Sequence, residues 1–271
     1  MNGASREALA AARERLDALT DSTSVNAGSL AEELAAVTAL LHREVSLRRV
    51  LTDPAQDGEA KAELAQRLLG AQVGGAAADL VSGMVRSRWS QSRDLVDALE
   101  ELADLTDLTA AQQAGALDGV EDELFRFGRI VSSSNELRAA LTDRKATTSA
   151  KSELLHSLLG RKAHATTERL VTRLVNAPRG RSLEAGLESL SKLAAGRRDR
   201  MVAVVTSAVP LSDSQKQRLG ASLAKLYGRR MHLNLAVDPE VIGGVRVQVG
   251  DEIINGSLAD RLEDASRRLA G

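Results

Sequence analysis

Histidine, cysteine and paired carboxylates carry most catalytic and metal-binding chemistry, and this 271-residue sequence offers few arrangements of them. Its four histidines are His42, His156, His164 and His232. No two of them have the i, i+4 spacing that places two imidazoles on one metal ion. The absence of cysteine excludes disulfides, thiolate ligands and cysteine nucleophiles. We therefore predict no metal site.

The acidic clusters and glycine pairs give no catalytic or cofactor motif. Glu121-Asp122-Glu123 points around different sides of a predicted helix, so it is interpreted as a solvated face rather than an acid/base pair. Asp251-Glu252 is assigned to a turn. Gly74-Gly75 and Gly243-Gly244 match neither the dinucleotide nor the phosphate-loop spacing. We predict no catalytic residue and no bound cofactor.

The basic clusters do not indicate nucleic-acid binding. Arg179-Gly180-Arg181 and 197–200 lack interleaved aromatic residues for base stacking, and only 1% of the chain is aromatic. The formal net charge is −1, from 36 basic and 37 acidic residues, so no bulk field attracts a polyanion. These arginines are interpreted as loop or helix-end charge.

Charge is nevertheless unevenly distributed along the chain. Residues 94–143 carry 12 acidic and 3 basic residues, a net charge of −9, whereas residues 144–200 carry 13 basic and 5 acidic residues, a net charge of +8. Packing side by side would let the two segments neutralise each other. The alternative is a charged docking surface for a partner.

Helical periodicity dominates the first 200 residues. Apolar residues recur at steps of three and four, and the core must be built from Ala, Leu and Val because the chain has one Trp, one Tyr and two Phe. Ser29-Leu30-Ala31-Glu32 has the form of a capping box and predicts a helix through about Val45. Residues 92–131 could form one helix or two, since Gly115 and Gly119 weaken the middle.

An internal repeat is visible when the sequence is shifted by 90 positions. Residues 46–70 then align with 136–160 at 12 of 25 positions, where about two matches would arise by chance. The predicted domains are a first helical bundle over 1–108, a second copy over 109–200, and a third domain over 201–271. The predicted fold is mainly α.

The period changes in the last 70 residues, which predict a small α/β domain. Residues 201–206, 233–237 and 245–249 have the composition or alternation of strands. A capping box at Ser212-Asp213-Ser214-Gln215 begins a helix, and a final helix begins at Ser257. Glycine inside a strand pattern predicts a bend at Gly243-Gly244, so that Gly243→Val would lower the melting midpoint.

No segment predicts membrane insertion or secretion. The N-terminus lacks the order of charge, apolar core and small residues of a signal peptide. The longest uncharged apolar stretch, about 201–211, is shorter than the roughly 20 residues a membrane-spanning helix needs.

The C-terminal motifs carry a resemblance to a known family. VVTSAVPL at 204–211 and LNLAVDPEVIGGVRVQVG at 233–250 resemble the signature of the delta-subunit family of F-type ATP synthase, whose mitochondrial member is the oligomycin-sensitivity-conferring protein. LRAAL at 137–141 and KSELL at 151–155 are similar to parts of that family's six-helix bundle. The resemblance covers about residues 109–271. The departure is the additional bundle before it.

The resemblance implies a non-catalytic subunit of the peripheral stalk, which links the catalytic alpha/beta head to the membrane-anchored b subunits. It implies that the bundle binds N-terminal helices of alpha subunits, that the C-terminal domain meets the C-terminal end of b, and that the chain lies at the cytoplasmic face of the cell membrane as a peripheral protein. The candidate partner-binding residues that follow are Leu137, Leu141, Leu154 and Leu158 for alpha, and Val245, Val247, Leu258 and Leu262 for b. Core packing is the competing role for each of these residues.

Two questions stay open from the sequence. The resemblance does not show which bundle copy docks the head or what the extra copy does. The alternatives are a generic helical adaptor or scaffold, which would explain the repeat but not the signature at 238–250, and an enzyme using a cleft beside the C-terminal domain, for which the spacing offers no convergent polar groups.

Overall fold

The fold was obtained as a computed structural model, and it forms two compact units, Met1–Arg197 and Arg198–Gly271. The structure describes residues 1–21, 25–198, 201–227, 231–238, 241, 244–249 and 252–255. Within the described residues, no helix combines the length and apolar content needed to cross a bilayer.

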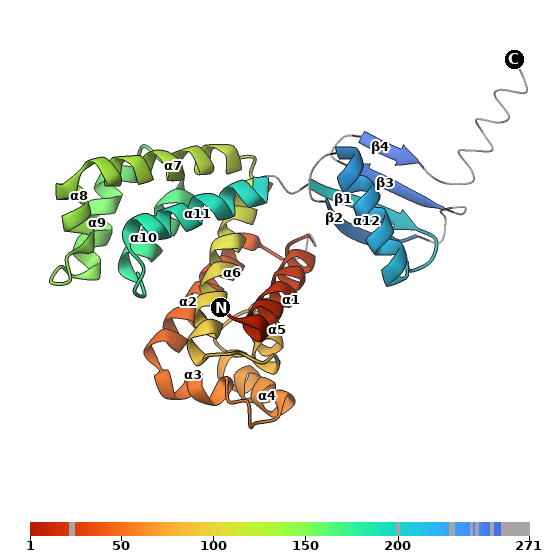
Figure 1. The fold of residues 1–271 in the computed structure, drawn as a ribbon, viewed down its shortest axis with the longest axis horizontal. Helices are drawn as coiled ribbons and strands as arrows, with labels where there is room; N and C mark the ends of the chain where they lie inside the picture. The colour runs from red at the N-terminus through yellow and green to blue at the C-terminus, as the bar shows by residue number, and fades with distance from the viewer. Residues whose placement is uncertain are drawn as a thin grey trace, which may run out of the picture. The chain divides into compact units, whose positions relative to one another are not determined.

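The described part of the first unit consists of eleven helices joined by short connections (Figure 1). We call α1 to α6 the first bundle and α6 to α11 the second bundle. The helices are α1 Gly3–Thr20, α2 Ala27–Arg43, α3 Val45–Leu51, α4 Gly58–Leu69, α5 Gly75–Arg86, α6 Ser92–Gln113, α7 Leu117–Ser133, α8 Asn135–Thr142, α9 Thr148–Leu159, α10 Ala165–Asn176 and α11 Leu183–Arg198.

The start of α2 differs from the prediction. Asn26 is the N-cap residue, and its side-chain oxygen accepts a hydrogen bond of 3.0 Å from the Ser29 backbone N–H. Ser29 therefore lies inside the first turn. The predicted capping box at Ser29 was wrong because Asn, which is as strong a cap as Ser, stands three residues earlier and takes the role.

The segment 92–131 forms two helices, because the chain turns at Gly115. Gly115 has φ +69, in the left-handed region that glycine enters without a Cβ clash. The Ala116 N–H donates to the Ala111 carbonyl at 2.8 Å and the Gly115 N–H donates to the Gln112 carbonyl at 3.0 Å. This pair of bonds is the Schellman motif that ends a helix, so α6 stops and α7 begins a new direction.

The 90-residue offset also relates the helices of the two bundles. The bounds of α2, α4 and α5 shifted by 90 residues give those of α7, α9 and α10. Local hydrogen bonds repeat as well. Thr52 Oγ1 donates to the Arg48 carbonyl at 2.8 Å and Thr142 Oγ1 to the Arg138 carbonyl at 2.7 Å. The repeat found in the sequence is therefore a repeat of structure.

Helix α6 serves both bundles. One core cluster runs from Ala8 to Ala103 and a second from Leu108 to Ala194, so the N-terminal part of α6 packs in the first core and its C-terminal part in the second. Fourteen of its 22 residues are buried, compared with seven of 18 in α1. The predicted domain boundary at 108 falls inside this helix, and the three-domain division stays a prediction.

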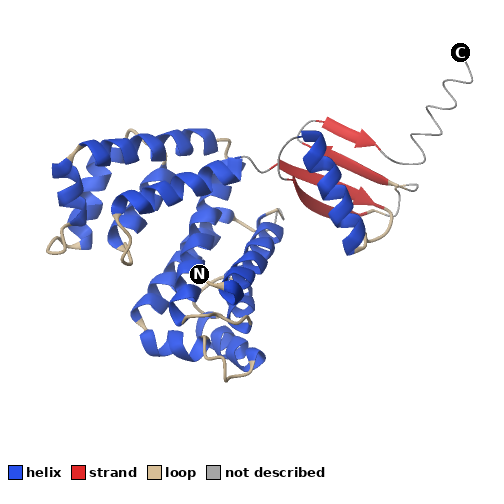
Figure 2. Ribbon diagram, in the orientation of Figure 1, coloured by secondary structure: helices blue, strands red, loops and turns tan. Residues whose placement is uncertain are grey.

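The second unit contains a four-stranded sheet in the order β2-β1-β3-β4 (Figure 2). The strands are β1 Met201–Ser207, β2 Met231–Val237, β3 Val245–Val249 and β4 Glu252–Asn255, with α12 Asp213–Tyr227 between the first two. β1 pairs in parallel with β2 and antiparallel with β3, and β3 pairs antiparallel with β4. Ala203, Val205 and Val247 form the centre of the core, against which Leu219 and Leu233 also pack.

The predictions for this unit hold in the strands and in the cap of α12. Gln215 accepts from the Ser212 N–H at 2.8 Å, and the Gln215 N–H donates to Ser212 Oγ at 3.4 Å, which confirms the capping box. The assignment of Glu252 to a turn was wrong, because it pairs with Val249 at the start of β4. Gly244 has φ +79, as a turn at the glycine pair requires. Gly243, Leu258, Leu262 and the final predicted helix lie outside the described residues.

Candidate docking site

His156 and His164 have structural roles in the helices. Among the described residues, no three His, Asp or Glu side chains come together as a metal ion would require. His164 caps α10 by accepting from the Thr166 N–H at 3.2 Å, and His156 Nδ1 lies 2.8 Å from Glu168. The side chain of His232 lies outside the described residues.

The acidic cluster on α7 is divided between two tasks. Glu123 Oε2 accepts from the His164 N–H at 2.9 Å and from the Thr167 hydroxyl, so it ties α7 to the start of α10. Asp122 forms an exposed pair with Arg126 four residues on, at 2.7 Å. The first role was not predicted, since only the fold brings residue 123 next to 164.

Four carboxylates line the side of α6 that faces the second bundle. Asp97, Glu100, Asp104 and Asp107 follow one another at steps of three, four and three residues, which places them on one helical face. We call them the acidic row. All except Asp97 are buried, so each needs a partner that compensates its lost hydration.

Helix α10 supplies two of the partners. Arg173 lies between two carboxylates, with Nη1 2.5 Å from Asp104 and Nη2 2.7 Å from Asp107. Arg169 donates from Nε and Nη2 to the other carboxylate oxygen of the same Asp107, Oδ1, at 3.0 and 2.8 Å. The Asp107 side chain is fully buried and holds both arginines.

The connection between α10 and α11 supplies the other two. Arg179 is 3% exposed at its side chain and pairs with Glu100 at 2.6 Å, while Arg181 pairs with the second oxygen of Glu100 at 2.6 Å. Arg179 also donates to the Val96 carbonyl at 3.1 Å. The backbone turns here through φ +49 at Arg179 and φ +82 at Gly180. The loop thus aims two guanidinium groups at one carboxylate.

A separate ion pair joins the two ends of the first unit. Arg197, at the end of α11, donates to Asp17 of α1 at 2.8 Å and to Gln112 of α6 at 2.7 Å. Both charged side chains are below 10% exposed. We call these ion pairs, together with those of the acidic row, the seam between the bundles. The ion pairs of the acidic row confirm the prediction that 94–143 and 144–200 pack with complementary charge.

Burial sets the protonation of one member of the seam. Burial raises the pKa of Asp104 to about 7, against the attraction of Arg173 and with the help of the neighbouring Glu100 and Asp107 charges. Burial lowers the pKa of Arg173, but Asp104 and Asp107 outweigh it and leave that pKa above its ordinary value. Arg173 is therefore always charged, and Asp104 is the group of this pair that titrates near neutral pH.

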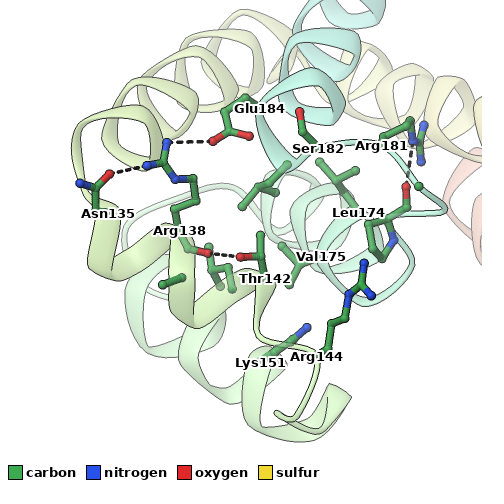
Figure 3. A pocket seen from close by; sticks show the side chains of 15 residues that line it. Asn135, Arg138, Thr142, Arg144, Lys151, Leu174, Val175, Arg181, Ser182 and Glu184 are labelled. Atoms are coloured by element: carbon green, nitrogen blue, oxygen red, sulfur yellow. Dashed lines mark hydrogen bonds and ion pairs between the residues drawn. The ribbon is translucent and has the colours of Figure 1, made fainter.

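A pocket of about 610 Å³ opens in the second bundle (Figure 3). Its apolar lining is exposed at Ala139 and Pro178, whereas Leu141, Leu174 and Val175 are buried in the core behind it. Four of the five charged residues at its rim are basic, and the five are Arg138, Arg144, Lys151, Arg181 and Glu184. This volume is within the range of ligand-binding pockets.

The structure places the candidate partner-binding leucines at the edge of the second core. Leu141 is 1% exposed and belongs to the core, whereas Leu137, Leu154 and Leu158 are half-buried and pack against it. Only Leu141 also lines the pocket. In the second unit, Val247 is 3% exposed and Val245 is half-buried at the core edge. The partner roles of all these residues stay predictions.

Comparisons with known proteins show a family match over part of the chain and curated relatives along its whole length. A model of the family described as ATP synthase delta (OSCP) subunit matches residues 105–269. The chain is similar to proteins named ATP synthase subunit delta from Streptomyces coelicolor, at 84% identity over 100% of this chain and 98% of the other, and from Thermobifida fusca, at 48% identity over 100% of both. A chain in a structure titled "Cryo-EM structure of Toxoplasma gondii mitochondrial ATP synthase hexamer, composite model" is 19% identical, covers 62% of this chain and 97% of that one, and has a TM-score of 0.27.

Proposed function

Because this chain belongs to the ATP synthase delta (OSCP) subunit family and is therefore a non-catalytic peripheral-stalk subunit of F-type ATP synthase, we propose that its second bundle docks the catalytic head. The observation that carries the proposal is the extent of the family match. The match begins at residue 105, inside α6, and takes in all of α7 to α11. This range supports our interpretation of the second bundle as the counterpart of the family's own bundle and of the first as the addition.

The docking partner we propose is the N-terminal helix of an alpha subunit. The half-buried Leu137, Leu154 and Leu158 leave part of their apolar surface open at the edge of the core, with Leu141 supporting them from inside. An amphipathic helix can bury such a surface. This arrangement favours stalk function over the generic adaptor, which would need no such family match.

We propose further that the C-terminal unit meets the C-terminal end of the b subunit. Val245 is half-buried at the edge of that core and Val247 supports it. Leu258 and Leu262, the other two candidates, lie outside the described residues. When two separate units of one chain bind their partners, each contact raises the effective concentration for the other. The linkage therefore stays intact under mechanical load. The location that follows is the cytoplasmic face of the cell membrane.

The role we propose for the extra bundle is to stiffen this joint. Both bundles share α6, and the seam holds α10 and the loop before α11 against α6, and the end of α11 against α1, through buried ion pairs. Guanidinium and carboxylate groups bond in fixed geometry, so these pairs fix the relative direction of the helices. A bundle held in this way extends the rigid body and adds no flexible link. The division into domains at 1–108, 109–200 and 201–271 is kept as part of this proposal.

The duplication provides its own control for a docking experiment. Leu154 and Leu158 correspond to Leu64 and Leu68 in the first bundle, so two double variants, Leu→Gln at each pair, carry the same chemical change. The full chain is used, because a cut at residue 108 would sever α6. Calorimetry with a peptide of the alpha N-terminus should show a loss of affinity of about tenfold, or about 1.4 kcal/mol, for the 154/158 variant alone.

The result that contradicts the proposal is equally specific. An affinity that falls only in the 64/68 variant would assign docking to the first bundle. Circular dichroism of both variants checks that the helices are retained. Equal affinity for both variants and the unmodified chain would remove these leucines from the contact.

A further inference from the structure

The pocket in the second bundle carries uncompensated positive charge. Arg138 and Arg181 at its rim are neutralised by Glu184 and Glu100, at 3.2 and 2.6 Å. The rim has only one carboxylate of its own, Glu184, and this carboxylate is already engaged by Arg138.

Arg144 and Lys151 make no ion pair with a described residue. Arg144 lies in the connection between α8 and α9, and Lys151 lies in the first turn of α9. Figure 3 shows both at one edge of the pocket, with Leu174 and Val175 between this edge and the Arg138–Glu184 pair in that view. The side chains thus offer two free cationic groups in a pocket whose lining also exposes Ala139 and Pro178.

The first bundle does not repeat this feature. The residue 90 positions before Arg144 is Pro54, and the residue 90 positions before Lys151 is Lys61, which is only 3% exposed. The connection that follows α5 also differs, because it carries the buried Trp89, whose indole N–H donates to the Met84 carbonyl at 2.8 Å. The corresponding residue in the second bundle is Arg179, which turns to the acidic row. Of the two bundles, only the second therefore has this open basic pocket among the described residues.

We propose that this pocket binds an acidic segment of a partner polypeptide, which places carboxylates on Arg144 and Lys151 and an aliphatic side chain on the exposed Ala139 and Pro178. Charge complementarity identifies the occupant as anionic, since the rim has two cations in excess. The exposed apolar lining favours a segment that carries Leu, Ile or Val next to its acidic residues, because a bare anion would leave Ala139 and Pro178 in contact with water. The site goes beyond the head-docking proposal, as it involves none of Leu137, Leu154 and Leu158.

The test measures binding of a fluorescein-labelled peptide built of Glu and Leu to the full chain by fluorescence anisotropy. The pocket variant is Arg144→Glu with Lys151→Glu. The matched control is Arg161→Glu with Lys162→Glu, which makes the same charge change at two exposed residues between α9 and α10 that do not line the pocket. The proposal expects a loss of affinity of about tenfold or more for the pocket variant and a change within about twofold for the control.

Two further arms separate the occupant from other anions. A second peptide, with Ser in place of each Leu, should bind about tenfold more weakly to the unmodified chain, because it loses the apolar contact with Ala139 and Pro178. Inorganic phosphate at equal concentration should not displace the Leu-containing peptide. Equal losses in the pocket and control variants, equal binding of the two peptides, displacement by phosphate, or no binding of the Leu-containing peptide would each overturn the proposal. The conservative variant Arg144→Lys with Lys151→Arg should bind like the unmodified chain.

Discussion

Replacing Arg173 by Met tests whether the seam couples the two bundles. Met keeps much of the apolar stem of Arg but removes the guanidinium that lies between Asp104 and Asp107. Asp107 retains two hydrogen bonds from Arg169, so most of the cost falls on Asp104. Removing one partner from a buried ion pair costs about 3–5 kcal/mol of stability, and we expect that loss at pH 8.

The loss of stability caused by Arg173→Met should depend on pH, and the direction of this dependence follows from the raised pKa of Asp104. Its pKa in the folded chain is raised to about 7, above the ordinary aspartate value, so protonating it favours the folded state as the pH falls from about 7 towards 4. At pH 6 most Asp104 is protonated and uncharged even with Arg173 present. The ion pair then contributes less, and the loss for Arg173→Met should shrink to about 2 kcal/mol.

Two optical probes make the coupling visible in one unfolding experiment. Trp89 is the only tryptophan, lies in the first core and is 7% exposed, so its fluorescence reports the first bundle, while circular dichroism reports all helices. Coincident transitions are expected for the unmodified first unit. In Arg173→Met, part of the helical signal should be lost at lower denaturant concentration than the Trp89 signal.

The control is Arg126→Met, which breaks the exposed pair with Asp122, where the side chains are 72% and 51% exposed. Such a pair contributes at most about 1 kcal/mol. The reasoning would be refuted by equal losses in the two variants, by a loss for Arg173→Met that is the same at pH 6 and pH 8, or by probes that still coincide.

Four other substitutions test three particular features. Arg197→Met, which leaves the buried Asp17 carboxylate without this partner, should lower the denaturation midpoint by an amount equivalent to about 3 kcal/mol. Gly115→Ala, at φ +69 with open space around the added Cβ, should cost about 1–2 kcal/mol in thermal unfolding, and no change would show that the turn does not need glycine. Asn26→Ala should cost about 1 kcal/mol and Ser29→Ala clearly less; the reverse order in chemical denaturation would restore Ser29 as the cap.

Much of the fold could be predicted because its signals are local. Helical periodicity, the strands after residue 200 and the capping box at Ser212 each depend on residues within one element. The errors arose where two local signals compete. Asn26 competes with Ser29 for the same cap, and Glu252 lies in a strand of four residues that is too short for alternation to be recognised.

The contacts of the site were only partly predictable for a different reason. The charge excess of 94–143 and 144–200 indicated that these segments pair, but pairing Arg179 with Glu100 requires a loop that turns through two left-handed residues. The sequence does not reveal that Arg144 and Lys151 are unpaired, because a basic residue looks the same in sequence whether or not a carboxylate lies next to it in the fold. Their difference is visible only once the carboxylates are placed.

The sharing of α6 determines how a chain of this kind can grow. Two separate six-helix bundles would need twelve helices, yet the described first unit has eleven. The reason is that α6 contributes buried residues to both core clusters. A third repeat added in the same manner would bring five helices, would begin within α11, and would need a new acidic stripe along that helix. Lengthening the helical unit by gene duplication would therefore require new apolar and acidic residues on the outer face of its last helix, α11.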